Sequence, residues 1–230
     1  LGLGDQGDSF IPSEVKTLSG KNVVSVVASG QYSMAVTSTG ELYSWGRNNE
    51  GQCGQGGSHR IVLQPKIVDT LMNKTVTMVS ASEMHCGAVT SGGELYTWGS
   101  GIYGKLGHNS ISDASAPRGV KALTGKRMTF IACGHCHTGA IDEDGNVMMW
   151  GGGWYGRLGV GDTGNRLAPV VVDALEGKGV KELHLGAFHT YAITDRKGEL
   201  YGWGRGDRVG LTDQSDQLRP AKVSLSPGSD

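Results

Sequence analysis

A seven-residue pattern that recurs four times constrains this chain more than any other feature. Its last copy, residues 198–204, reads Gly-Glu-Leu-Tyr-Gly-Trp-Gly, and the earlier copies are residues 40–46, 93–99 and 145–151. The tryptophans of the four copies stand 53, 52 and 53 residues apart: Trp45, Trp98, Trp150 and Trp203. A fixed period of this size indicates a repeat architecture, which is a solenoid, a propeller or an array.

Each repeat predicts four short β-strands. In the first copy an apolar run at residues 22–28 is followed by a second run at 33–37, a turn that ends in Gly40, and the tryptophan strand. A glycine-rich loop then leads to a proline, which we expect to start a fourth strand; the prolines are Pro12, Pro65, Pro117, Pro169 and Pro220. Helical periodicity is missing, and four antiparallel strands per period are typical of one propeller blade. The sequence therefore predicts an all-β propeller of four-stranded antiparallel blades.

The repeats are expected to form a single domain over residues 1–230. Its units are residues 1–52, 53–105, 106–157 and 158–208, with a partial unit at 209–230. The chain begins without Met, and residues 1–5 match residues 158–162, so we expect it to be cut from something longer or to form an unusually short ring. A partial ring would leave open sheet edges, which invite self-association.

Composition excludes several classes of protein. The net charge is −1, which argues against a nucleic-acid surface. No apolar run reaches the roughly 18 residues of a membrane span, and no signal peptide is present, so we expect an intracellular protein in the cytoplasm or nucleus. Neither a nucleophile elbow nor a phosphate loop is found, so we expect no enzyme activity and no cofactor.

Three histidines also follow the period. They are His85, His137 and His189, and Tyr32 stands at the matching place in the first repeat. They could form a ring of bases or metal ligands at the channel. We favour a structural role, in which each bonds a loop backbone of its own blade, because tyrosine would be a poor member of a metal ring. The four anchor tryptophans are interpreted as packing residues.

Residues 133–137 match the C-x-x-C-H pattern of c-type haem attachment. In register with the repeats, however, Cys133 stands where Ala28, Ala81 and Leu185 stand, at the end of an apolar strand. His137 is the ordinary repeat histidine. We therefore expect neither haem nor a metal site.

Trp154 is the one tryptophan that departs from the period. It lies in a glycine loop with Tyr155 and Arg157, and Tyr103 lies in the neighbouring loop. Tryptophan, tyrosine and arginine on exposed loops are preferred anchors of protein interfaces. The candidate partner-binding residues, which meandering blades would place on one face, are Asn49, Tyr103, Trp154, Tyr155, Arg157 and Asp207. The alternative is that the loop aromatics lie over their own blade.

The whole repeat resembles that of the regulator of chromosome condensation (RCC1-like) family. The resemblance rests on the tryptophan strand and on the Gly-x-x-His-Thr segments, such as residues 134–138 and 186–190. It implies a seven-bladed β-propeller, of which this chain carries about four and a half repeats. Many members of that family are propellers within ubiquitin ligases, kinases and ciliary proteins, where the propeller holds partners. The resemblance implies a similar binding role for this chain. We favour such a scaffold or regulatory role, with a protein partner bound through one loop face.

Two other activities of the family are implied less strongly. The founding member is a nucleotide-exchange factor for the Ran GTPase and carries a wedge-like insertion, which the regular spacing here leaves no room for. The resemblance implies acidic and polar loop residues as contacts to the GTPase. The loop positions that match them here are Asn49, Ile102, Trp154 and Asp207, of which only Asp207 is acidic. Exchange on a small GTPase therefore stays the second candidate. A plant ultraviolet photoreceptor of the family has Trp just before the repeat His, where this chain has Gln31, Met84, Cys136 and Phe188.

Overall fold

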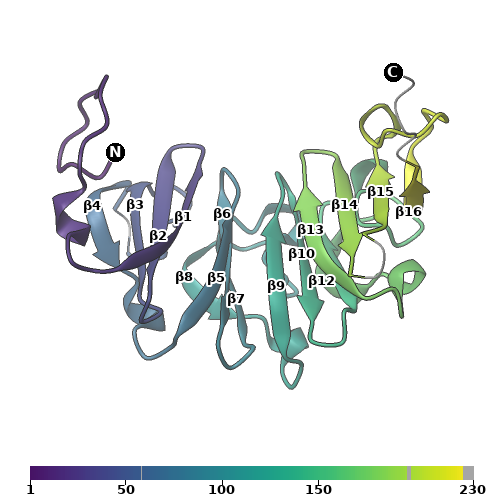
Figure 1. Ribbon diagram of the computed structural model, residues 1–230, viewed down its shortest axis with the longest axis horizontal. Coiled ribbons are helices and arrows are strands. Elements are labelled where there is room, and N and C mark those ends of the chain that lie inside the picture. Colours follow the sequence, from purple (N-terminus) through teal and green to yellow (C-terminus); the bar gives the residue numbers. More distant parts are fainter. Residues whose placement is uncertain (58, 196–197, 225–230) are drawn as a thin grey trace.

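The computed structural model describes residues 1–57, 59–195 and 198–224. In these ranges sixteen strands form four sheets, and each sheet contains four antiparallel strands in sequence order (Figure 1). The prediction of an all-β propeller with four-stranded antiparallel blades is confirmed. Each sheet is one blade, and the blades follow one another along the chain.

The strands have the following bounds. The first blade contains β1 (Val23–Ser29), β2 (Tyr32–Thr37), β3 (Leu42–Arg47) and β4 (Ile61–Ile67). The second contains β5 (Val76–Ala81), β6 (His85–Thr90), β7 (Leu95–Gly99) and β8 (Ala114–Gly119). The third contains β9 (Met128–Cys133), β10 (His137–Asp142), β11 (Val147–Gly151) and β12 (Arg166–Val171). The fourth contains β13 (Val180–Leu185), β14 (His189–Thr194), β15 (Leu200–Gly204) and β16 (Gln217–Val223).

Seven single-turn 3-10 helices lie between strands or before β1 in the described ranges. They are η1 (Lys16–Leu18), η2 (Asp69–Leu71), η3 (Ile102–Gly104), η4 (Lys121–Leu123), η5 (Trp154–Gly156), η6 (Asp173–Leu175) and η7 (Gly206–Arg208). The helices η3, η5 and η7 belong to the loops that follow the tryptophan strands. The helices η2, η4 and η6 belong to the connections between successive blades.

The sequence led us to expect that the prolines start the fourth strands, and this expectation is wrong. The strand β4 begins at Ile61, and Pro65 lies inside it. There the pairing with β3 is irregular, because Ser44 pairs with Lys66 whereas Gly46 pairs with Val62. An irregularity of this kind needs no ladder hydrogen bond from the proline. The same break in pairing recurs beside the fourth strand of each later blade.

The meander gives the molecule two faces. The β1–β2 and β3–β4 loops and their equivalents lie at one end of the blades, called here the loop face. The tight β2–β3 turns and the connections between blades lie at the other end, called the hairpin face. Each tight turn uses a glycine with positive φ, such as Gly40 at 83° and Gly93 at 80°, a conformation that glycine adopts without a steric penalty.

The hydrophobic core lies between blades. Three buried clusters each join side chains of two successive blades. In the cluster between the third and fourth blades, for example, Val147 and Met149 pack with Leu183 and Trp203. A single blade cannot bury both of its faces, so each blade depends on its neighbour for stability.

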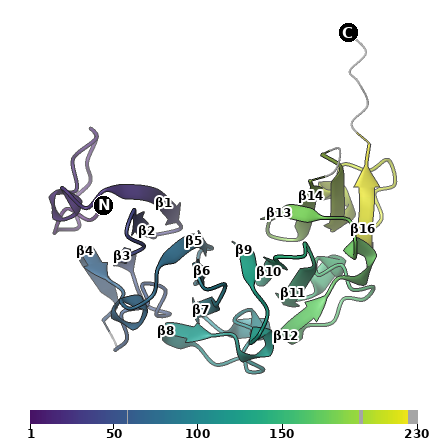
Figure 2. The same cartoon turned by 60° about the horizontal axis from the view of Figure 1, so that its bottom comes forward.

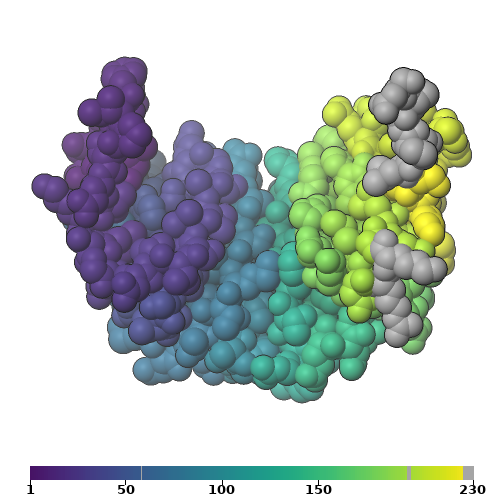
Figure 3. All heavy atoms as spheres, in the orientation of Figure 1, coloured from purple at the N-terminus to yellow at the C-terminus, as the bar shows by residue number. Residues whose placement is uncertain are grey.

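The four blades form an open arc (Figure 2), and spheres outline the same arc with the first and fourth blades at its two ends (Figure 3). Val26 of β1 is 70% exposed, whereas its counterpart Val79 of the second blade is 7% exposed. The inner strand of the first blade therefore presents a surface that the other blades bury. Self-association through open sheet edges stays a prediction.

The segment before the first blade takes the place of a preceding loop. The Gly4 amide donates to the Leu63 carbonyl at 3.2 Å, as the Gly161 amide donates to the Leu218 carbonyl at 2.9 Å. The backbone of Gly2 lies against the Trp45 indole in the same way. Residues 1–5 thus pack on the first blade as residues 158–162 pack on the fourth.

Candidate functional site

Three of the anchor tryptophans pack between blades and also bond each blade to the loop of the blade before it. Trp98, Trp150 and Trp203 are fully buried. Trp98 Nε1 donates to the Gln52 carbonyl, and Trp203 Nε1 donates to the Arg157 carbonyl, both at 2.9 Å. Trp150 does the same with the carbonyl of Lys105. The tryptophan therefore contributes both apolar burial and one directed bond to each blade joint.

The repeat histidines reach across to the following blade, and Nδ1 of His85 also lies 2.6 Å from Ser82 Oγ in a loop of its own blade. The ring partners of His85 and His137 are side chains, and not the loop backbone that the sequence led us to expect. His85 Nε2 lies 2.8 Å from Thr138 Oγ1, and His137 Nε2 lies 3.0 Å from Thr190 Oγ1. Thr138 uses its one hydroxyl hydrogen to donate to the Lys105 carbonyl at 2.7 Å, so its oxygen accepts from the histidine. The interaction is possible because the curvature of the arc brings the two blades together at this level.

Burial fixes the charge of these histidines. Desolvation lowers the pKa of His85 and of His137 well below the usual range, and nearby Lys105 and Arg157 add to the effect. Both rings are therefore neutral at physiological pH. His189, in the last blade, is only partly buried, and its pKa is lowered less strongly for the same main reason.

The joint between the first and second blades uses other side chains. Tyr32, at the histidine position, donates its hydroxyl to the Ser82 carbonyl at 2.5 Å. Cys86, at the threonine position, donates to the Gln52 carbonyl at 3.1 Å. Burial raises the pKa of Tyr32, which stays protonated. This joint shares with the later joints a backbone carbonyl acceptor, here that of Gln52, and the tryptophan. Tyr32 and Cys86 replace the histidine and the threonine of the later joints.

The C-x-x-C-H segment of the third blade takes part in the joints on both of its sides. The Cys133 amide donates to Ser80 Oγ at 2.9 Å, and the Nε2 atom of His137 faces Thr190. Within the described residues no group of three or more His, Cys, Asp or Glu side chains could hold a metal ion. These contacts favour the structural interpretation of the segment.

Four aromatic side chains gather on the loop face. Tyr103 and Trp154 meet edge to face with ring centroids 4.5 Å apart, and Tyr155 meets Phe188 in the same manner at 5.3 Å. Trp154 is 39% exposed and Tyr155 is 38% exposed. With Arg157 and Arg205 they form what we call the aromatic loop cluster, which spans the loops of the second, third and fourth blades.

Arg157 lies beneath this cluster and is fully buried. Its Nε donates to the Gly152 carbonyl at 2.7 Å, and its Nη1 donates to the Ala187 carbonyl at 2.6 Å. The guanidinium lies 5.0 Å from the Trp154 ring. The expectation of an exposed contact residue is therefore wrong for Arg157, because the side chain is used to join two blades and to support the tryptophan.

Two of the aromatic residues have an unusual backbone. Tyr103 has a φ of 62° and Tyr155 a φ of 61°, the left-handed region that favours glycine. For a bulky residue this conformation costs about 1–2 kcal/mol. Each tyrosine is followed directly by a glycine, Gly104 or Gly156, in equivalent loops. Strain of this kind is typical of functional sites, where it aims a side chain in a set direction.

The remaining predicted residues lie at the edge of the cluster or apart from it. The Asp207 carboxylate is 2.9 Å from Arg205 Nε and 3.6 Å from Arg208 Nε, so its charge is largely neutralised. Asn49 is exposed in the β3–β4 loop, and no ring contact or ion pair joins it to the cluster among the described residues. The structure brings Tyr103, Trp154 and Tyr155 together and leaves Asn49 outside.

Two members of the cluster, Phe188 and Arg205, were not predicted from the sequence. The guanidinium of Arg205 lies 5.3 Å from the Tyr155 ring and 5.9 Å from the Phe188 ring. Phe188 stands just before the repeat histidine, in a loop of the same face, and that position was the available signal. Arg205 directly follows the tryptophan strand of the fourth blade, where the third repeat has Gly152, and only the fold shows that it reaches Tyr155 of the preceding blade.

No helix in the described ranges is long and apolar enough to cross a membrane. Two curated proteins are similar to nearly the whole chain. The ultraviolet-B receptor UVR8 of Arabidopsis thaliana is 36% identical over 225 residues, which are 97% of this chain and 51% of the receptor. The E3 ubiquitin-protein ligase HERC2 of Homo sapiens is 35% identical over 229 residues, which are 97% of this chain and 5% of the ligase.

A solved structure has the same blades. The crystal structure of human WBSCR16 superposes with a TM-score of 0.79 at 29% identity, over 88% of this chain and 53% of that one. The chain thus spans about half the length of UVR8 and of WBSCR16. A family model described as the RCC1-like domain matches residues 1–230. The chain belongs to the RCC1-like domain family of β-propellers.

Proposed function

We propose that this chain is a regulatory protein-interaction propeller whose loop face binds a protein partner inside the cell, in the cytoplasm or nucleus. The aromatic loop cluster carries the proposal. Trp154 and Tyr155 are each more than one-third exposed although they belong to a packed set of rings and guanidinium groups. Preorganised aromatic and arginine side chains are the usual hot spots of protein interfaces, because little entropy is lost when they bind.

The relatives support a binding role without catalysis by the propeller. The chain matches 5% of the ligase HERC2, so a propeller of this kind is a small module of a much larger enzyme. In the described part of this chain, the buried histidines bond threonines of the next blade and the buried Arg157 bonds carbonyls. These groups are used in holding blades together, which leaves the exposed rings of the aromatic loop cluster, Trp154 and Tyr155, as the best candidates for recognition.

Substitution of the exposed anchors tests the proposal. Trp154→Ala and Tyr155→Ala should each weaken a captured partner by about 2 kcal/mol or more, which is roughly a 30-fold loss of affinity. Ile102→Ala is the matched control, because Ile102 occupies the equivalent position in the second blade and is 44% exposed. The measurement is capture from cell lysate, identification of the protein by mass spectrometry, and titration of that purified protein.

The outcome is decided by comparing the three variants. Loss of binding in Trp154→Ala and Tyr155→Ala, with Ile102→Ala near wild type and all thermal melting curves intact, supports the proposal. Equal binding by all three variants would remove the aromatic loop cluster as the contact surface. Loss of binding together with a lowered melting temperature would point to a structural role for the rings.

Nucleotide exchange on a small GTPase is less well supported. The aromatic loop cluster is cationic and apolar, and the carboxylate of Asp207 at its edge is already paired with two arginines. We expect the chain at micromolar concentration to leave the release of fluorescent GDP from a Ran-like GTPase unchanged. Accelerated release of GDP would instead favour exchange activity as the function of this chain.

A further inference from the structure

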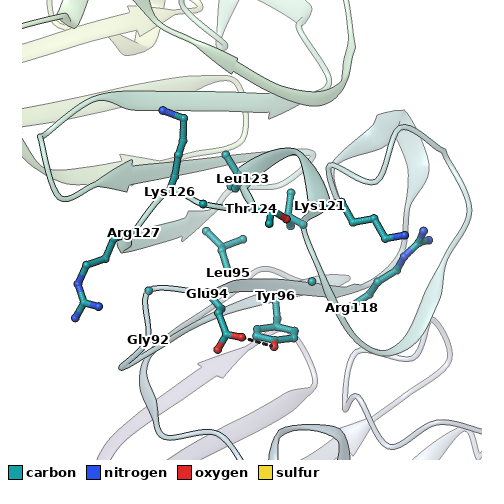
Figure 4. A pocket seen from close by; sticks show the side chains of 14 residues that line it. Gly92, Glu94, Leu95, Tyr96, Arg118, Lys121, Leu123, Thr124, Lys126 and Arg127 are labelled. Carbon is teal, nitrogen blue, oxygen red and sulfur yellow. Dashed lines mark hydrogen bonds between the residues drawn. The ribbon is translucent and has the colours of Figure 1, made fainter.

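A cavity of about 560 Å³ lies on the hairpin face between the second and third blades (Figure 4). Leu95, Val120 and Leu123, which line it, are largely buried and supply apolar surface. Tyr96 lies at one side, where its hydroxyl is 3.5 Å from Glu94 Oε1. The size suits a small molecule or a few side chains of a peptide.

The rim of this cavity is strongly basic. Figure 4 shows Arg118 and Lys121 close together on one side and Arg127 on the opposite side. Arg118 and Lys121 form no ion pair within 4.0 Å among the residues that the structure describes. Arg127 Nη2 donates to the Ser91 carbonyl at 2.9 Å, and its Nε is 3.9 Å from the exposed Glu143 carboxylate, a contact too long and too hydrated to neutralise the guanidinium.

The internal repeats show that this charge is specific to one groove. Lys121 begins the 3-10 helix η4, whereas the equivalent residues in the other two inter-blade connections are Asp69 and Asp173. Arg118 corresponds to Lys66 and Val170. Repeat architecture alone therefore does not demand cations at these positions.

The full set of equivalent positions gives the same contrast. Between the second and third blades they carry Arg118, Lys121, Lys126 and Arg127 against Glu94. Between the first and second blades they carry Lys66 and Lys74 against Glu41 and Asp69. Between the third and fourth blades they carry Lys178 against Asp144, Asp173 and Glu176. One groove is basic, one is balanced and one is acidic.

The shape of the basic groove has a similarly local cause. Gly119 pairs with Tyr96 in the sheet, where the other two grooves have Ile67 and Val171. A Cβ atom added at Gly119 would meet only Tyr96 Cε1, at 3.8 Å. The absence of a side chain at this position therefore keeps the groove open beside the cationic rim.

We propose that this basic groove binds an acidic peptide segment of a partner protein. An apolar side chain of the peptide would lie against Leu95 and Leu123. Its carboxylates would pair with Arg118 and Lys121 at one side and with Arg127 at the other, where charge-assisted hydrogen bonds are stronger than neutral ones. The groove lies on the hairpin face, so it is a second site, independent of the aromatic loop cluster.

The test uses the full chain and a labelled synthetic peptide of seven residues that alternates acidic residues with leucine. We expect micromolar binding by fluorescence anisotropy, weakening as salt is raised. Lys121→Asp, which installs the residue of the other two grooves, should lower the affinity at least tenfold. Lys16→Asp is the matched control, because exposed Lys16 begins the equivalent helix η1 before the first blade and the charge change is the same.

Filling the groove gives a second measurement. Gly119→Val should abolish peptide binding with an unchanged melting temperature, because Val171 stands at this position in the third blade. A control peptide carries glutamine in place of each acidic residue. The proposal is overturned if the wild-type chain fails to bind at 1 mM peptide or binds this control peptide equally well. It is also overturned if Lys16→Asp weakens binding as much as Lys121→Asp, or if Gly119→Val binds like the wild type. Binding of Trp154→Ala to the peptide keeps this result separate from that of the loop face.

Discussion

The joint between the first and second blades differs from the two joints that follow it. All three share a tryptophan that donates to a carbonyl of the preceding loop. The later two add a neutral histidine that donates to a threonine of the next blade, whereas the first uses Tyr32 and Cys86. The geometry of the joint is thus held by the backbone acceptor and the tryptophan, while the remaining partners vary in chemistry and in their response to pH.

Removing the tryptophan should have the largest effect, and the same effect at either kind of joint. We expect Trp98→Ala and Trp203→Ala each to lower the free energy of unfolding by about 3–5 kcal/mol, because each removes a fully buried indole and its hydrogen bond. Urea unfolding followed by circular dichroism measures both. A difference of more than about 2 kcal/mol between the two variants would show that the joints do not share this element.

Acid should separate the two kinds of joint. His85 and His137 have a pKa below the unfolded value of about 6.5, so the unfolded chain binds more protons as the pH falls, and stability is lost below that value. At pH 5.5 each histidine should cost about 1.4 kcal/mol relative to pH 7.5. His137→Gln, which keeps an N–H donor and does not titrate, should reduce the loss by that amount.

Tyr32→Phe is the control for this measurement, because the tyrosine stays protonated throughout the range. Its loss of stability between pH 7.5 and 5.5 should equal that of the wild type. A wild-type chain whose free energy of unfolding is the same at both values would contradict neutral buried histidines. The measurement is urea unfolding at the two pH values under constant ionic strength.

Exchange of the two joints should have the smallest effect at neutral pH. Tyr32→His combined with Cys86→Thr installs the pair found at the later joints. We expect the free energy of unfolding at pH 7.5 to change by about 1 kcal/mol, since the positions are equivalent and the Gln52 carbonyl remains as acceptor. The same double variant should gain an acid-dependent loss of about 1.4 kcal/mol at pH 5.5. A loss of more than about 3 kcal/mol at pH 7.5 would mean that the joints are not interchangeable.

The aromatic loop cluster shows how far sequence reasoning could proceed toward a site. Trp154 was identified because it departs from the period, and its loop placed it on the same face as Tyr103 and Tyr155. Burial of Arg157 could not be foreseen, because its acceptors include a carbonyl of the next blade, 30 residues further along the chain. Sequence spacing does not specify contacts between blades at that resolution.

The sequence by itself determined the period, the four strands of each blade and the family. Those features follow from local patterns: apolar runs, turn glycines and a tryptophan at a constant spacing. Only the tertiary structure decided that His137 donates a hydrogen bond to Thr190 and that Gly119 and Lys121 make one groove open and basic. These results depend on side chains from successive blades, which meet only when the sheets pack against one another.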